Sequence, residues 1–309
     1  MRSLLSSLRR SVWMPRRWRA AVSLQELRNR QLVVGLGSMK SGTTWLSSYL
    51  QSHPQFLHSP VKEMNVFNQM FPNPANSSWS DYRLLRMDKL VLSYGKDPGR
   101  LARADQWERF DRLRALAQLG AIQDFDAYLA YFAERISQEW HFGEITPAYS
   151  HLPPEALQQI AGLTSDVRFL FLMRDPTARA ASHLRHLRRR VRKGEDLDAL
   201  IAEVAPGHAV FRRSDYRDTL QALRDAGLLD RAYCIIYEQL FSQAEMDSLC
   251  RWLGMANHPA DFEQRLNPSV GEGLSSRQMA QLRQRLDPIY QGLRNEPLVS
   301  SFSGWAWNG

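Results

Sequence analysis

The chain has 309 residues, of which 44% are hydrophobic, so it is long enough to bury a large core in one or two domains. Its 40 lysines and arginines outnumber its 32 acidic residues, and the net charge of +8 suits an anionic ligand, nucleic acid or an acidic membrane surface. No stretch approaches the roughly eighteen uninterrupted apolar residues of a membrane-spanning helix, and the two cysteines, which lack a CxxC spacing, exclude a disulfide framework.

The first 30 residues form a basic N-terminal segment. No acidic residue precedes Glu26, and arginines alternate there with Trp13 and Trp18. Two interpretations stay open, namely contact with an anionic membrane surface and a poorly ordered basic tail. We expect a cytoplasmic protein, with peripheral membrane attachment through this segment as the second option. The sequence does not predict an oligomeric state.

Residues 31–36 predict a buried strand, and residues 43–51 predict a helix that follows a glycine-rich loop. In this stretch, "VVGLGSMKSGTTWL", Gly37 and Gly42 keep the G-x-x-x-x-G spacing of a Walker loop. Thr43 occupies the position of the Walker lysine, and the lysine lies inside the loop as Lys40. A strand, a glycine loop and a helix N-terminus place backbone N–H groups around an anion. We therefore predict a phosphate site, against the alternative of a turn that binds nothing. Its expected hydroxyl donors are Ser41, Thr43 and Thr44.

Residues 55–59 predict a short second strand, and Lys62 and Glu63 follow it. A carboxylate near a phosphate loop could take a proton from an attacking hydroxyl, whereas an exposed Lys62–Glu63 ion pair is the structural alternative. Residues 72–123 are charged and lack strand patterns, so we interpret them as a helical insertion on the acceptor side. Residues 125–140 show helical spacing.

Strands and helices alternate through the second half of the chain. The continuous apolar run "VRFLFLM" (167–173) predicts a parallel strand that is buried on both faces. Asp175 and Pro176 then supply the N-cap and the first-turn proline of a helix that reaches Arg190. The other predicted elements are a strand, turn and helix within 142–163, a strand at 232–237, and helices at 197–204, 215–226, 244–253 and 275–293. This alternation predicts an α/β, P-loop-type, three-layer fold with a central, mainly parallel sheet flanked by helices, and residues 31–309 form a single domain.

A second phosphate contact is predicted where the strongest strand ends. Arg174 follows that strand, and ligands of open α/β sheets bind outside the carboxyl ends of strands. Ser182 lies two turns into the next helix, and an arginine and a hydroxyl can share the oxygens of one phosphate. By itself, an arginine followed by a serine at this spacing is explained by a surface salt bridge. The phosphate interpretation is favoured only because the glycine loop is also present.

Together these motifs resemble a PAPS-dependent sulfotransferase, closest in pattern to the carbohydrate (heparan-sulfate-type) and bacterial branches. "KSGTTWL" resembles the family's 5′-phosphosulfate loop, "RDPTARAASHLRH" its 3′-phosphate motif, and "VKEMNVF" the segment that carries a catalytic glutamate. "GEITPAYS", the late "IIYEQLFSQAEMDSLCRWLGM" and "LNPS" follow in the family order.

The resemblance implies a role for each candidate residue. The donor would be 3′-phosphoadenosine 5′-phosphosulfate (PAPS), used without a metal, and the product would be a sulfated acceptor hydroxyl on a carbohydrate, lipid or other small molecule. Charge develops on the bridging oxygen of the 5′-phosphate, where Lys40 would stabilise it. The backbone of Ser41–Trp45, including Gly42, would hold the 5′-phosphate, Arg174 and Ser182 would hold the 3′-phosphate, and Glu63 would be the base.

The chain departs from the family pattern on the acceptor side. Asn65 and Asn68 stand where the glycan branch often has histidine and aspartate, and Ile145 stands where a lysine commonly follows the glutamate of "EKTP". The late R-K-G loop of the cytosolic branch is replaced by "VGEGLSSR", which leaves Arg277 as its substitute.

Other functions stay open at this point. A P-loop kinase would use ATP and Mg²⁺, but no lysine follows Gly42, and Asp175 fits a helix cap better than a metal ligand. A basic module for nucleic acid or a membrane surface would explain "RHLRRRVRK", although we expect no nucleic-acid partner. Should Glu63 not be the base, Glu144 and His58 are the next candidates.

Overall fold

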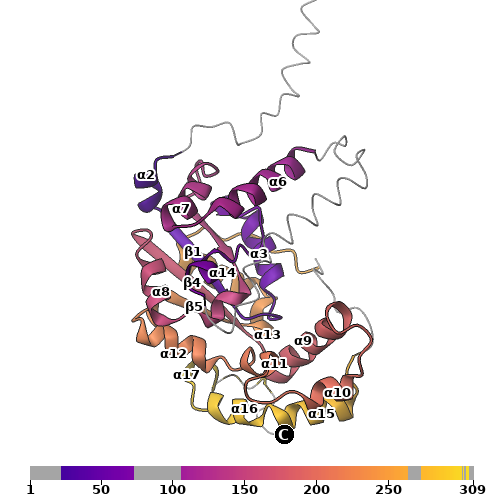
Figure 1. Ribbon diagram of the computed structural model, residues 1–309. Helices are drawn as coiled ribbons and strands as arrows, with labels where there is room; N and C mark the ends of the chain where they lie inside the picture. Colours follow the sequence, from indigo (N-terminus) through magenta and orange to yellow (C-terminus); the bar gives the residue numbers. More distant parts are fainter. Residues whose placement is uncertain (1–21, 73–105, 264–272, 301, 303, 306–309) are drawn as a thin grey trace, which may run out of the picture.

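The computed structural model describes residues 22–72, 106–263, 273–300, 302, 304 and 305. Its centre is a five-stranded sheet in the order β2-β3-β1-β4-β5, and every pairing is parallel (Figure 1). The strands are β1 (Gln31–Gly37), β2 (Phe56–His58), β3 (His141–Ile145), β4 (Asp166–Met173) and β5 (Ala232–Ile236). The predicted α/β architecture is therefore confirmed, and the sheet is parallel throughout the described residues.

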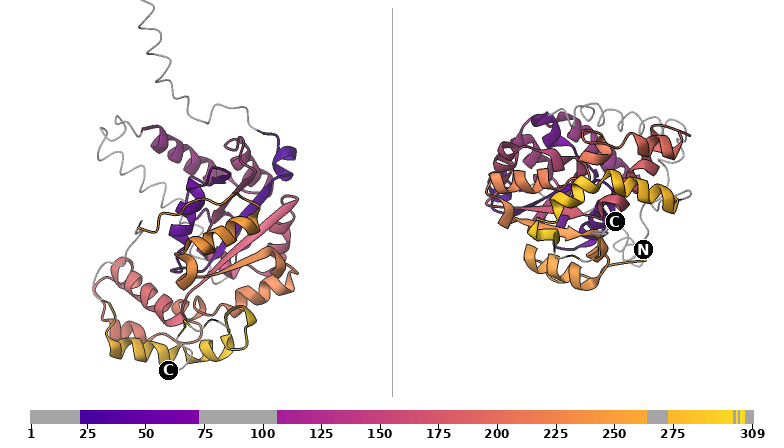
Figure 2. Two further views of the ribbon diagram at one scale, coloured as in Figure 1. Left: turned by 180° about the vertical axis from the view of Figure 1, so that it is seen from behind. Right: turned by 90° about the horizontal axis from the view of Figure 1, so that it is seen from below.

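Helices cover both faces of the sheet, and two apolar clusters lie between the layers (Figures 1 and 2). Alternate residues of β4 enter opposite clusters: Phe169 and Phe171 join the larger one, and Leu170 and Leu172 join the smaller one. This two-sided burial explains why the strand is apolar without interruption. The smaller cluster takes its helical residues from α3 (Thr43–Ser52), α13 (Tyr237–Leu240) and α14 (Gln243–Leu253).

The remaining helices complete the opposite face and the two ends of the molecule. In chain order they are α2 (Leu24–Arg28), α4 (Val66–Met70), α6 (Gln106–Ala121), α7 (Phe125–Ala133), η4 (Pro147–His151), α8 (Pro154–Ala161), α9 (Pro176–Arg190), α10 (Leu197–Ala202), α11 (Ala209–Arg212), α12 (Arg217–Asp225), η5 (Leu229–Arg231), α15 (Ser276–Arg285), α16 (Asp287–Leu293) and α17 (Pro297–Ser300). In Figures 1 and 2, α15 and α16 lie at the opposite end of the molecule from α2 and α6.

Two predicted helices differ from those observed. The helix expected at 275–293 is interrupted at Leu286, because Pro288 cannot continue α15 and instead lies in the first turn of the new helix α16. The helix expected at 125–140 ends at Ala133. Between α7 and β3, the backbone N–H and the hydroxyl of Ser137 both donate to the Glu139 carboxylate, and the chain turns toward β3.

Other predictions hold, or fall partly outside the described residues. Asp175 caps α9, its carboxylate accepting the Ala178 N–H at 2.8 Å, as predicted. Within the proposed insertion the structure describes α6, whereas residues 73–105 lie outside the described part, as do residues 1–21 and the "LNPS" motif. Among the described residues, no helix has the length and apolar character needed to cross a membrane.

Candidate active site

The predicted site residues follow the carboxyl ends of neighbouring parallel strands. Lys40 follows β1, Glu63 follows β2 and Arg174 follows β4. β1 pairs with β3 on one side and with β4 on the other. The loop after β1 therefore lies at the switch point of the sheet, between the strands β3 and β2 on one side and β4 and β5 on the other. This edge is the usual ligand site of an open α/β sheet.

The loop after β1 has the geometry of an anion cradle. Gly42 is the N-cap of α3, has a φ of +87° and provides no side-chain cap. The backbone N–H groups of Gly42 and Thr43 donate to no acceptor within the described residues. A left-handed backbone favours glycine, and an added Cβ here would lie 2.6 Å from Cδ2 of Leu240. The glycine therefore permits a helix N-terminus whose N–H groups remain available to an anion.

Internal hydrogen bonds hold the loop against β4 and α9. The Ser38 N–H donates to the Leu172 carbonyl at 2.7 Å, and the hydroxyls of Ser38 and Ser41 lie 2.6 Å apart. Arg174 Nη1 donates to the Lys40 carbonyl at 3.2 Å, and the hydroxyl of Tyr216 in turn donates to the Arg174 carbonyl at 2.7 Å. The cradle is thus fixed by the strand that also carries the second predicted phosphate ligand.

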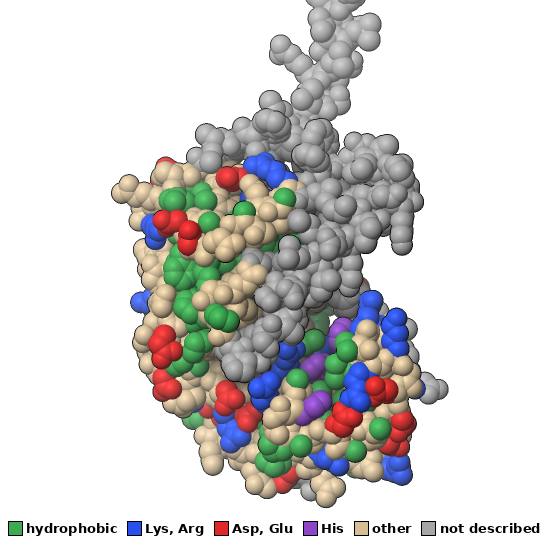
Figure 3. Space-filling view, in the orientation of Figure 1, with side chains coloured by type: hydrophobic (Ala, Val, Ile, Leu, Met, Phe, Trp, Pro, Cys, Tyr) green, Lys and Arg blue, Asp and Glu red, His purple; other side chains and the backbone are tan. Residues whose placement is uncertain are grey.

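Positive charges surround Lys40. Burial lowers the pKa of Lys40, and the positive charges of Arg189, Lys62, Arg174 and Arg185 lower it further. Among the described residues, no acidic side chain forms an ion pair with Lys40, Arg185 or Arg189. Figure 3 shows lysine, arginine and histidine side chains gathered on the lobe that contains α9. A cluster of positive charges of this kind favours a bound anion.

Arg174 and Ser182 belong to this cationic region but do not contact one another. The Arg174 guanidinium lies over the ring of Tyr237, 4.1 Å from its centroid, and its Nε has no hydrogen-bond partner within the described residues. Ser182 is 6% exposed and lies one helical turn before Arg185. Burial and the nearby positive charge of Arg174 lower the pKa of Arg185. The shared contact of Arg174 and Ser182 with a phosphate stays a prediction.

Lys62 connects the Glu63 segment to the loop. Its ammonium donates to the Thr44 hydroxyl, and it lies 3.4 Å from Glu63 Oε1. Both side chains are about a quarter exposed, so the pair is partly accessible to a ligand rather than buried in the core. The structure thereby joins the predicted base and the predicted cradle through one lysine.

Trp45 has a mainly structural environment. Its indole is 5% exposed, stacks on Phe262 with ring centroids 5.6 Å apart, and donates through Nε1 to the Asp261 carbonyl at 3.2 Å. Its backbone N–H donates to the Gly42 carbonyl at 2.9 Å. A direct role for Trp45 in holding a phosphate therefore stays a prediction.

Arg179 is a supporting residue that sequence reasoning missed. Its side chain is fully buried, and it donates to the Ser214 hydroxyl at 2.8 Å, to the Val210 carbonyl at 2.6 Å and to the Met39 carbonyl in the loop at 3.4 Å. Burial lowers the pKa of Arg179 to about 10. The only sequence signal for it was an arginine among alanines on the inner face of the predicted helix.

Glu144 and His58, the alternative bases, are both buried. Glu144 is 1% exposed, and burial raises its pKa to about 7 although three hydrogen-bond donors oppose this change. His58 is 7% exposed, its Nδ1 lies 2.8 Å from the Ser59 carbonyl, and burial lowers its pKa to about 4. Neither side chain is as accessible to an acceptor as Glu63.

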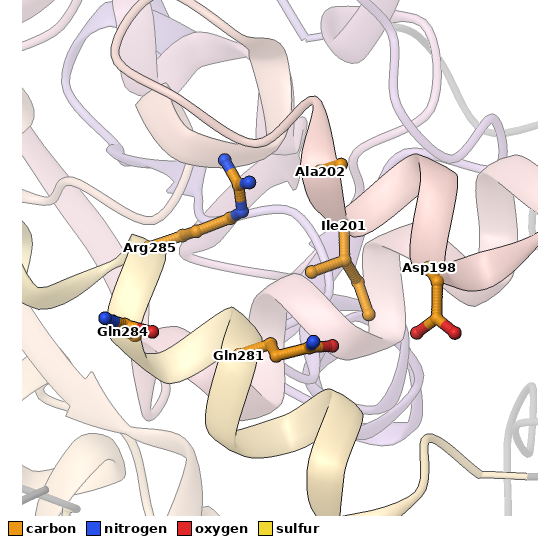
Figure 4. Close-up of a pocket in the computed structure, with 6 residues that line it drawn as sticks. All are labelled: Asp198, Ile201, Ala202, Gln281, Gln284 and Arg285. Carbon is orange, nitrogen blue, oxygen red and sulfur yellow. The ribbon is translucent and has the colours of Figure 1, made fainter.

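Two cavities among the described residues lie away from this site. One of about 470 Å³ lies between α10 and α15, and another of about 460 Å³ lies beside α12 and α16. In the first, Arg285 donates to the Val204 carbonyl and Asp198 accepts from Arg277 and Gln278, so its charged groups already have partners (Figure 4). The carboxyl edge of the sheet, rather than these cavities, contains the convergent polar groups.

Comparisons with known proteins bear on the family and on the fold of the chain. A family model described as the sulfotransferase family matches residues 33–259. The crystal structure of a sulfotransferase from Alicyclobacillus acidocaldarius is 20% identical, covers 86% of this chain and 94% of that chain, and gives a TM-score of 0.57. At that identity the likeness establishes the fold alone.

Two further relatives are more limited. The membrane-associated sulfotransferase kil1 of Dictyostelium discoideum is 41% identical over 59 residues, which span 18% of this chain and 12% of that protein's length. The mouse sulfotransferase SULT7A1, crystallised in complex with PAP, is 11% identical over 89% of this chain and 90% of that chain, with a TM-score of 0.44.

Proposed function

The chain belongs to the sulfotransferase family, and we propose that it transfers the sulfuryl group of PAPS to an acceptor hydroxyl by in-line displacement. The observation that carries this proposal is the uncapped helix N-terminus after Gly42 beside a lysine set among other cations. PAPS has a 5′-phosphosulfate that fits this cradle and a 3′-phosphate that requires a second cationic contact. Arg174 supports that contact, because it leaves the next strand and touches the loop.

The chemical step can be assigned to side chains of this chain. The acceptor oxygen forms a bond to sulfur while the bond from sulfur to the bridging phosphate oxygen breaks, and the acceptor proton passes to the Glu63 carboxylate. Negative charge grows on the bridging oxygen, where the Lys40 ammonium stabilises it. Burial and neighbouring cations lower the pKa of Lys40 in the absence of ligand, and an arriving polyanion offsets this effect and favours the charged ammonium.

The acceptor side is built from a different part of the site. Lys62 and Glu63 lie together beyond Thr44, so an acceptor hydroxyl that reaches Glu63 approaches from the side of β2. The positively charged side chains of α9 next to Lys40 favour acceptors without competing positive charge. The wider acceptor class, whether carbohydrate, lipid or another small molecule, is best found by a transfer screen with labelled PAPS.

Isothermal titration separates this function from the two alternatives. We expect the product nucleotide, 3′-phosphoadenosine 5′-phosphate (PAP), to bind tightly without added metal, and ATP with Mg²⁺ and duplex DNA to bind weakly. Preferential binding of ATP with Mg²⁺ would support a kinase, and preferential binding of DNA would support a basic binding module. Loss of PAP binding in Arg174→Ala, with retention in Arg277→Ala, would place the nucleotide at the cradle.

A further inference from the structure

Glu144 lies at the centre of a buried polar network next to the proposed base. Thr146 Oγ1 donates to its Oε2 at 2.6 Å, and the Tyr149 hydroxyl donates to its Oε1 at 2.6 Å. The Met64 N–H donates to Oε2 at 3.3 Å, although Met64 is 80 residues earlier in the chain. No lysine or arginine pairs with this carboxylate within the described ranges, so hydrogen bonds alone compensate it.

The same network binds three backbone N–H groups of the segment after Glu63. Besides the Met64 N–H, the Asn65 N–H donates to Thr146 Oγ1 at 3.3 Å and the Phe67 N–H donates to the Tyr149 hydroxyl at 3.4 Å. The Met64 and Asn65 N–H groups lie just before α4, and the Phe67 N–H lies in its first turn; the N-cap residue, Asn65, provides no side-chain cap of its own. The network therefore caps α4 from a distant part of the chain.

The capped segment has an unfavourable backbone conformation. Glu63 has a φ of +57° and Asn65 has a φ of +56°, both in the left-handed region that non-glycine residues rarely adopt. Such residues persist only where the surrounding structure holds them, and they concentrate at functional sites. The segment they shape begins with the Lys62–Glu63 pair that contacts Thr44 in the loop.

We propose that Glu144 is a positioning residue for sulfuryl transfer, holding the backbone of residues 64–67 so that the Glu63 carboxylate stays beside Lys62 and the phosphate loop. This inference rests on the proposed function, since it takes Glu63 as the base. Glu144 is itself 1% exposed and acts through the backbone, without contact to the acceptor.

The hydrogen bonds around Glu144 favour its ionised form. Thr146 and Tyr149 each accept a backbone N–H and donate their own hydrogen to the carboxylate. A protonated acid would have to donate to one of these groups and would reverse its hydrogen bond. The titratable groups facing Glu144 are Glu63 and the tyrosines at 128, 131 and 149, whose charges or hydroxyls come from the base segment, α7 and η4.

Burial places the ionisation of Glu144 near neutral pH. Burial raises the pKa of Glu144 to about 7, and the Thr146 and Tyr149 hydrogen bonds oppose that rise. Transfer by the wild-type protein should therefore increase as pH rises through about 7. Removing either hydroxyl should raise the pKa of Glu144 further. The rise of activity with pH, called the pH limb below, should then move to higher pH.

The test compares Thr146→Val, Thr146→Ser and Tyr149→Phe with the wild-type protein, using labelled PAPS over a range of pH. We expect Thr146→Val and Tyr149→Phe to lower kcat by up to about 100-fold at neutral pH and to move the pH limb to higher pH. The affinity for PAP should be unchanged. Thr146→Ser keeps the hydroxyl and should behave like the wild type. A purely structural role would lower the yield of folded protein without moving the pH profile.

Two results would overturn the inference: an unchanged pH limb in both Thr146→Val and Tyr149→Phe, or equal losses in Thr146→Val and Thr146→Ser. If Thr146→Val does not fold, Tyr149→Phe decides alone, because its ring keeps the packing and only the hydroxyl is lost. Failure of the proposed function is separate, since it would appear as absent PAP binding and transfer in the wild-type protein.

Discussion

The buried carboxylate of Glu144 should leave a measurable signature in the pH dependence of folding stability. Its pKa is raised from the ordinary value of 4.5 to about 7, so between these pH values the folded chain holds a proton that the unfolded chain has released. Stability contributed by this residue is therefore complete below about pH 4.5 and falls as pH rises toward 7. Each pH unit is worth about 1.4 kcal/mol, so the full loss is about 3 kcal/mol.

Three buried or half-buried histidines contribute with the opposite sign and hide this loss in the wild-type stability curve. Burial lowers the pKa of His58, His141 and His151 from 6.5 to about 4. Each is neutral when folded and protonated when unfolded in that range, so each stabilises the fold increasingly as pH rises from about 4 to 6.5. The wild-type stability curve alone therefore does not report Glu144, whereas the difference from a Glu144→Gln variant does.

The assay is denaturant unfolding of wild type and Glu144→Gln at a series of pH values. The amide mismatches the donors around it, which lowers stability by an amount independent of pH. Superimposed on this offset, the variant should gain about 3 kcal/mol relative to wild type between pH 4.5 and pH 7. Glu155→Gln makes the same chemical change at an exposed position of α8 and serves as the control. A flat difference curve for Glu144→Gln would refute the reasoning.

The catalytic assignments give four further predictions. Lys40→Ala should lower kcat by about 10²–10³-fold with little loss of PAP affinity, and near-wild-type turnover with labelled PAPS would remove its role. Glu63→Gln should lower kcat by about 10²–10⁴-fold while titration shows unchanged PAP affinity; an effect confined to the acceptor KM would move the base elsewhere. Arg174→Ala should weaken PAP by about 1.5–3 kcal/mol and AMP far less, and equal losses for the two nucleotides would contradict a 3′-phosphate contact. Gly42→Ala forces a left-handed alanine against Leu240 and should abolish PAP binding, whereas Gly120→Ala, where an added Cβ meets nothing within 4 Å, should bind normally.

The sequence predicted the sheet well because its strands carry an unambiguous physical signal. Residues 167–173 are buried on both sides, so every position is apolar, and the observed β4 extends the prediction by one residue. The glycine loop was equally clear, since its spacing reflects a backbone path that few other residues permit. Helix ends were less clear: the apolar spacing of 125–140 continues to the buried Ile136, although α7 ends at Ala133.

The supporting parts of the site could not be predicted, because tertiary packing alone brings them together. Nothing local to Glu144 indicates that its carboxylate accepts the N–H of Met64, and nothing local to Lys62 indicates contact with Thr44. In the sequence, Arg185 could be recognised only as part of a charged helix face, and exposure of that face to solvent explains its charge equally well. Its neighbourhood with Lys40 follows from the way α9 returns over the end of β4.

Arg179 shows how the fold can support an anion site without weakening it. Its guanidinium is fully buried, yet within the described residues all three of its hydrogen-bond acceptors are neutral, and one of them is the Met39 carbonyl of the loop. A buried carboxylate would satisfy the guanidinium more strongly, since burying an unpaired charge is unfavourable. It would also place a negative charge directly behind the cradle and repel the phosphosulfate. Neutral acceptors fix the loop and leave the positive field intact, and with a pKa of about 10 Arg179 stays charged at neutral pH. In the proposed function, the burial of an unpaired Arg179 charge lowers stability but keeps the cradle attractive to a polyanionic donor.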